Sequence, residues 1–142
     1  MLVVENGYWN RVSYLKFDLT NVTTAPTSAK FNLTVDPLTY GNSTINLKVY
    51  SVSNTWTETG LTYNNQPNFN PASKTSTGTF LTSQPVTWVA NGTISLDLTS
   101  FIAANLGKVV TFQLINESQD FVGLVLKSRE ATSGQPLLKI AY

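Results

Sequence analysis

Residues 29–35, AKFNLTV, alternate between apolar and polar side chains. Successive side chains of a β-strand point to opposite faces of its sheet, so Phe31 falls on one face and Lys30 on the other. The same pattern recurs in residues 11–19, RVSYLKFDL, and in residues 45–52, INLKVYSV, each with one lysine on the polar face. The alternation predicts antiparallel strands that have one buried face and one solvated face.

The rest of the chain contains further short runs rich in Val, Ile, Thr, Phe and Tyr, separated by clusters of Asn, Gly, Pro or Ser. Nine strands are expected, near residues 2–5, 11–19, 28–36, 44–53, 86–89, 93–98, 109–115, 121–128 and 136–141. Helical periodicity is confined to residues 99–108, TSFIAANLGK, which predicts one short helical turn. Many short strands with almost no helix predict an all-β fold, a two-sheet antiparallel β-sandwich of the jelly-roll or Greek-key type.

The length of 142 residues predicts one domain, residues 1–142, with a core that needs no disulfide. The longest interval between expected strands, residues 54–85, is rich in Asn, Thr and Pro but contains Trp56, so it predicts a packed loop. Charged residues make up only 12% of the chain, and Ser, Thr and Asn take their place, as is common in extracellular β-proteins. We therefore expect a monomeric extracellular module, secreted or at the cell surface, that is part of a larger exported protein.

The composition also argues against several classes of function. The chain has no His and no Cys, which removes the commonest general base, the thiol nucleophile and the commonest metal ligands. A net charge of +1, without a basic helix or an RNA-binding aromatic motif, argues against nucleic acid. No run approaches the ~20 apolar residues of a membrane span, so no membrane partner is expected. We expect no cofactor; the alternative is a structural Ca²⁺, for which Asp18, Asp36 and Asp97 would have to meet through the fold.

The lysines of the three alternating stretches suggest a basic surface. If these strands share a sheet, its solvated face gathers Lys16, Lys30 and Lys48, and it also carries Tyr14 and Tyr50. The chain has only 9 Lys and Arg residues, so this cluster would be a local positive field that the small net charge hides. The alternative is that these lysines are solubilising residues or guards on an exposed sheet edge.

Four segments resemble, in order, the DNRLRE or disaggregatase-related domain, a family that includes carbohydrate-binding modules attached to alginate lyases. The segments are NRVSYLKFDL at 10–19, YSVSNTWTETGLTYNNQP at 50–67, TISLDLTSFI at 93–102 and LKSREATSGQPLLKIAY at 126–142. The resemblance spans nearly the whole chain. The family usually opens with one more strand, of the Ala-Asp-Ala-Tyr-Val type, so we expect that the chain is truncated there or that another strand fills that edge.

The resemblance implies a non-catalytic β-sandwich that binds an acidic polysaccharide, alginate or a similar polyuronate, and holds an attached lyase on it. Lysine would contact the uronate carboxylates as a mobile charge, whereas arginine can form two hydrogen bonds to one carboxylate. The candidate ligand-binding residues are Lys16, Lys30, Lys48, Tyr14, Tyr50, Arg11, Lys127 and Arg129. Arg129 is equally suited to pairing with Glu130 or another acid. Arg11 has the parity of Leu15, so it points inward or lies at the rim of the strand unless a bulge intervenes.

Two other functions fit the same residues. The domain is alternatively a structural or adhesive module of a cell-surface protein, whose lysines bind nothing specific. The other alternative is a polysaccharide lyase in which Tyr14 and Tyr50 serve as acid and base beside Lys16 and Lys48. The products distinguish the three: a lyase generates unsaturated sugar ends, a binding module retains the polymer unchanged, and a structural module does neither.

Overall fold

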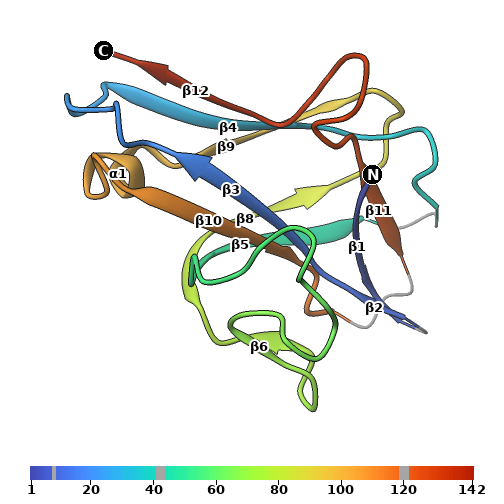
Figure 1. Ribbon diagram of the computed structural model, residues 1–142. Coiled ribbons are helices and arrows are strands. Elements are labelled where there is room, and N and C mark those ends of the chain that lie inside the picture. The colour runs from blue at the N-terminus through green and yellow to red at the C-terminus, as the bar shows by residue number, and fades with distance from the viewer. Residues whose placement is uncertain (8, 41–43, 119–121) are drawn as a thin grey trace.

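The computed structural model describes residues 1–7, 9–40, 44–118 and 122–142, and Figure 1 shows that they form a two-layer β-sandwich. One layer is an antiparallel sheet in the order β3-β10-β5-β8. Its strands are β3 (Ser13–Asp18), β10 (Val109–Ile115), β5 (Ile45–Val52) and β8 (Thr79–Val86). The opposite layer has the order β12-β4-β9, with β12 (Leu137–Ala141), β4 (Ser28–Thr34) and β9 (Thr93–Asp97). The predicted all-β sandwich is thus confirmed.

Smaller elements complete the two layers. A third sheet has the order β11-β1-β2, with β1 (Leu2–Asn6), β2 (Asn10–Arg11) and β11 (Gly123–Leu126). It joins the second layer through an antiparallel bridge between Val35 and Leu126. The helix α1 (Thr99–Ala103) is the predicted helical turn, and a hairpin of β6 (Phe69–Asn70) and β7 (Thr75–Ser76) lies in the long loop. Within the described ranges, no helix has the length and apolar character needed to cross a membrane.

The core lies between the two layers and is built from the apolar parity of each strand. Phe31 of β4 and Phe112 of β10 are fully buried, with ring centroids 5.2 Å apart, and Phe17 of β3 contacts both rings. Aromatic pairs at this separation add about 0.5–1.5 kcal/mol beyond the burial of their area. These three rings therefore connect the sheets and fix the inward parity of their strands, as the alternation predicts.

Two strand boundaries differ from the prediction. The prediction of a strand at residues 86–89 is wrong. The strand β8 ends at Val86, and most of its residues lie in the interval predicted to be a loop. Pro85 lies inside β8, which is an edge strand, and an edge strand tolerates the missing N–H of proline. Residues 11–19 form two strands, β2 and β3, with a break at Val12. Of the strand expected at 121–128, Phe121 lies outside the described residues.

The strands carrying Lys16, Lys30 and Lys48 do not share a sheet, so this prediction is wrong. Lys16 and Lys48 lie on β3 and β5, which flank β10, whereas Lys30 lies on β4 in the opposite layer. All three strands have the same local alternation, and that alternation does not specify which layer a strand joins. The three lysines therefore belong to two different outer faces of the sandwich.

Candidate functional site

The outer face of the β3-β10-β5-β8 sheet is covered by the long loop at residues 53–78, which Figure 1 shows below that sheet. Two polar residues of β10 on this face, Thr111 and Gln113, are fully buried. The indole N–H of Trp56 donates to the hydroxyl of Thr111 at 3.1 Å, and the Gln113 amide donates to the Tyr14 hydroxyl at 2.8 Å. The predicted packed loop is confirmed, and it covers the face on which the sequence placed a basic surface.

Lys16 holds this loop in place. Its ammonium group donates to the backbone carbonyls of Asn54 at 3.0 Å and Trp56 at 2.7 Å. The same group lies 4.7 Å from the centroid of the Trp56 ring, within the range of a cation–π contact. These contacts give Lys16 a structural role at the start of the loop.

Lys48 and Tyr50 hold the other end of the loop through Glu117. The Lys48 ammonium lies 2.6 Å from the Glu117 carboxylate, and the Tyr50 hydroxyl donates to the same oxygen at 3.1 Å. The second carboxylate oxygen accepts the backbone N–H of Ser76 in β7 at 2.9 Å. Burial alone would raise the pKa of Glu117, but the hydrogen bonds from Lys48, Ser76 and Tyr50 lower it below its usual value. The carboxylate thus stays ionised and fastens the β6–β7 hairpin to the sheet.

Both candidate tyrosines are held protonated. Burial raises the pKa of Tyr14 to about 12, and its hydroxyl donates to the Pro67 carbonyl at 3.1 Å. Burial, together with the bond to Glu117, raises the pKa of Tyr50 to about 12. A lyase base needs a phenolate or a pKa near the working pH. Neither tyrosine has that property, and both hydroxyls are engaged with the protein.

The two candidate arginines are engaged with carboxylates. Arg11 of β2 lies 3.5 Å from the buried Glu5 and is exposed, so of the expected positions the inward one is excluded, because β2 is a separate strand from β3. Arg129 bonds Glu130 and Glu58, each at 2.7 Å. The structural pairing of Arg129 with Glu130 that the sequence suggested is therefore present.

The outer face of the β12-β4-β9 sheet is an open surface that carries three lysines. We call it the lysine face and define it by the outward residues of these strands and the adjoining Lys127. They are Lys30, Asn32 and Thr34 on β4, Thr93, Ser95 and Asp97 on β9, and Leu137, Lys139 and Ala141 on β12, with Lys127. The alternate residues of β4, Ala29, Phe31 and Leu33, are fully buried, which turns the polar set outward. With three lysines and Asp97, the face is positive by two charges.

Lys30 and Lys139 lie directly opposite each other in the β4–β12 register. Opposed side chains have Cβ atoms about 4.5–5.5 Å apart, and like charges at that separation are destabilising. Lys30 also bonds Asp97 on the other neighbouring strand at 2.6 Å. Hydrogen bonds from Lys30 and Thr99 hold the pKa of Asp97 well below its usual range, so this carboxylate stays charged.

Lys127 lies farther along the same face. Its backbone N–H donates to the Thr34 carbonyl at 2.9 Å, so Lys127 lies beside Thr34. Thr34 follows Lys30 by four residues on β4, a separation of about 13 Å along the strand. The following loop turns back over these residues at Gly134, where a Cβ would lie 2.9 Å from the Thr34 hydroxyl and 3.1 Å from Cδ of Lys127. Gly134 has a φ of +73°, so glycine suits both the turn and the close approach.

The lysine face thus brings together two predicted residues, Lys30 and Lys127, with Lys139, which sequence reasoning missed. The signal was available, because Lys139 alternates with Leu138 and Ile140 in a strand that the sequence predicted. The ligand-binding role of all eight predicted residues remains a prediction. Among the described residues, no group of three or more His, Cys, Asp or Glu gathers as a metal site. Asp18 and Asp36 instead accept backbone N–H groups two residues along, from Thr20 and Leu38.

The comparisons with known proteins identify one family. The family model described as carbohydrate-binding module family 96 matches residues 1–142. The search of curated proteins gave no match.

Proposed function

The chain belongs to carbohydrate-binding module family 96, and on this premise we propose that its ligand is an acidic polysaccharide, alginate or a similar polyuronate, which it binds without cleavage. The observation that carries the proposal is the opposition of Lys30 and Lys139 on an exposed sheet face. Each sugar of a polyuronate carries a carboxylate. A carboxylate bound between the two ammonium groups would reduce their repulsion, so binding of an anion at this position is favourable.

The other groups of the lysine face suit the same ligand. In the part of the chain that the structure describes, neither Lys127 nor Lys139 forms an ion pair, so both are available to a polyanion. The hydroxyl groups of the exposed Thr93 and Ser95 lie among the lysines and can bond ring hydroxyls. Lys127 lies beside Thr34, and Thr34 is about 13 Å along the strand from Lys30. Lysines this far apart suit a polysaccharide chain better than a single sugar.

The expected affinity comes from several weak contacts. Exposed ion pairs give about 0–1 kcal/mol each, so three lysines acting together supply at most about 3 kcal/mol, and added salt weakens them. We further propose that the domain works as a monomeric module of a larger extracellular protein and holds an attached lyase on its substrate. The composition and the family resemblance support that role.

Native affinity electrophoresis tests the proposal. The protein is run in gels containing alginate, heparin or a neutral glucan, at low and at high salt, and the alginate is then assayed for unsaturated ends. We expect retardation in alginate that falls with salt, and no new unsaturated ends. Unretarded mobility in alginate would favour a structural module, and unsaturated ends would favour a lyase.

A further inference from the structure

A groove follows the free edge of β3, on the side away from β10. Its volume is about 670 Å³, within the range of 300–1,000 Å³ typical of small-ligand sites. Residues 12–18 form one wall, and residues from the segments at 56–61 and 128–136 complete the lining together with Leu2 and Val109. β3 is the edge strand of its sheet, so alternate backbone N–H and C=O groups along this wall point away from β10. The groove therefore offers both donors and acceptors along its length.

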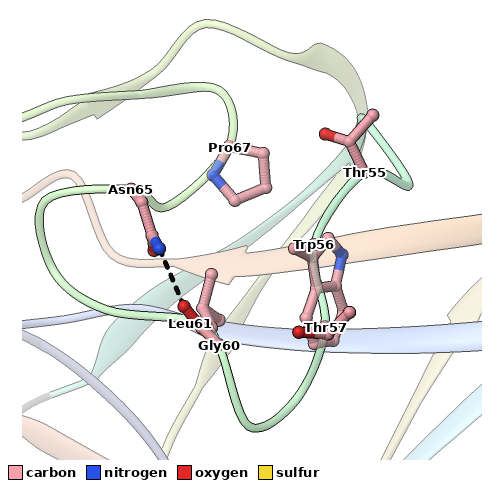
Figure 2. A pocket seen from close by; sticks show the side chains of 7 residues that line it. All are labelled: Thr55, Trp56, Thr57, Gly60, Leu61, Asn65 and Pro67. Atoms are coloured by element: carbon pink, nitrogen blue, oxygen red, sulfur yellow. Dashed lines mark hydrogen bonds between the residues drawn. The ribbon is translucent and has the colours of Figure 1, made fainter.

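A second hollow of about 280 Å³ adjoins this groove, because Trp56 and Leu61 line both. Figure 2 shows the hollow between the segment at Thr55–Thr57 and the turn that carries Asn65 and Pro67. The Asn65 amide donates to the Gly60 carbonyl at 2.7 Å and so connects two of the residues that line the hollow. The lining combines an indole ring, an aliphatic side chain and threonine hydroxyls. This is the chemistry that sugar rings and their hydroxyl groups require.

The charges of the groove differ from those of the lysine face. Its charged residues are Lys16 and Arg129 against Asp18, Glu58 and Glu130. Both cations are already engaged, Lys16 with two carbonyls and Arg129 with two carboxylates. Hydrogen bonds from Ser128 and Arg129 lower the pKa of Glu130 to about 2, so this carboxylate remains an acceptor at any ordinary pH. A polyuronate would be repelled here, whereas an uncharged sugar would not.

The ring at the junction of the two hollows is held rigidly. The Trp56 indole N–H is bonded to Thr111, the ring lies under the Lys16 ammonium, and its centroid is 5.8 Å from that of Tyr14. A binding group that is already fixed loses little conformational freedom when its ligand arrives. The packing role of Trp56 and a role in binding are therefore compatible.

We propose that the groove and the adjoining hollow form a second carbohydrate site, which takes an uncharged pyranose chain. The module would then bind two chemically different glycans, an acidic one on the lysine face and a neutral one beside Trp56. The second site does not depend on polyuronate binding. An extended peptide added to the edge of β3 would use the same backbone groups, but it would not use the threonine hydroxyls of the adjoining hollow.

Nuclear magnetic resonance of the tryptophan indole N–H groups tests this site in the intact chain. Trp9→Phe and Trp88→Phe identify two of the three indole signals and leave that of Trp56 by elimination. The probes are cellohexaose, mannohexaose, laminarihexaose, an alginate hexasaccharide and an extended threonine–valine hexapeptide. We expect at least one neutral hexasaccharide to shift the Trp56 signal saturably, with Trp9 and Trp88 unmoved and with little effect of the alginate probe on Trp56.

Two matched variants place the ligand. Thr57→Val removes a hydroxyl from the hollow without changing its shape, and we expect the neutral sugar to bind at least threefold more weakly. Thr93→Val makes the same change on the lysine face and should leave that affinity unaltered. The proposal is overturned if no neutral hexasaccharide moves the Trp56 signal, if only the peptide or the alginate probe does, or if both valine variants bind the sugar as the wild type does. Alginate retention by the lysine face is read separately, in the affinity gels.

Discussion

Lys30 on β4 and Lys139 on β12 lie opposite each other in neighbouring strands. Lys30 forms an ion pair with Asp97 of β9, whereas Lys139 forms no ion pair among the described residues. The β12-β4-β9 sheet therefore contains two opposed positive charges, and a carboxylate neutralises only one of them. In the other layer, Lys16 donates hydrogen bonds to two carbonyls of the loop, and Lys48 forms an ion pair with Glu117. Substitution should consequently lower stability at Lys48 and leave it nearly unchanged at Lys139.

Lys48→Ala is expected to lower stability. It leaves the largely buried Glu117 carboxylate without its closest partner, which costs about 1–3 kcal/mol in the free energy of unfolding and lowers the thermal midpoint by roughly 3–10 °C. Lys139→Ala, the matched control on an exposed strand, should change the free energy of unfolding by about 0.5 kcal/mol or less. Thermal unfolding followed by calorimetry measures both. Equal midpoints for the two variants would refute the fastening role of Lys48.

Glu117 is expected to make stability depend on acid pH. Its folded-state pKa lies below the usual 4.5, so its contribution is fully present above pH 4.5 and is lost as the pH falls through the folded-state pKa. Glu117→Gln should be less stable than the wild type at neutral pH, and the gap should narrow between about pH 5 and pH 3. Urea unfolding across this range measures the gap. A gap that is constant with pH would show that the carboxylate charge is irrelevant.

The buried Tyr14 and the partly buried Tyr50 predict a loss of stability in alkali. Their pKa values are about 12 in the folded protein against 10 in an exposed phenol, so the stabilisation is complete below pH 10 and is lost as the pH rises toward 12. Tyr14→Phe loses its bonds to Gln113 and Pro67 and should be less stable at neutral pH. Its stability should nevertheless fall less steeply above pH 10. Unfolding curves whose alkaline slopes coincide would contradict the assignment.

Gly134→Ala is expected to disturb the position of Lys127. The substitution adds a Cβ at a φ of +73° and places it against Thr34 and Lys127, so the cost should exceed the ~1 kcal/mol of backbone strain alone. Gly107→Ala is the matched control, because Gly107 has a φ of +70° and no atom within 4 Å of an added Cβ. We expect Gly134→Ala alone to weaken alginate binding. Equal effects of the two variants on stability and on binding would mean that the close approach at Gly134 is unimportant.

The sequence predicts the strands well because local alternation is what buries or exposes a strand residue. The parity of Phe17, Phe31 and their neighbours, the short helix and the packed loop follow from such local patterns. β8 was misplaced because its residues do not alternate and because Pro85 lies within it. An edge strand can carry such a sequence, and edge position is a property of the whole sheet.

The candidate site was less predictable, because it depends on strand order. Lys16, Lys30 and Lys48 occur in nearly identical local patterns, yet pairing with β10 or with β12 places them in opposite layers. The polar parity of β10 likewise suggests a solvated face, whereas Thr111 and Gln113 are buried by a loop that is distant in sequence. Lys139 becomes a partner of Lys30 only through the register of the first and last parts of the domain.

The most direct test of the lysine face is the dissociation constant for alginate oligosaccharides, measured by titration calorimetry. The combined variant Lys30→Ala, Lys127→Ala and Lys139→Ala is compared with the wild type and with Lys74→Ala plus Lys108→Ala, two lysines outside that face. The contacts estimated above predict a measurable loss of affinity in the face variant, of up to about 100-fold, with the control within about twofold of the wild type. Retention of wild-type affinity by the face variant, or an equal loss in the control, would contradict the account.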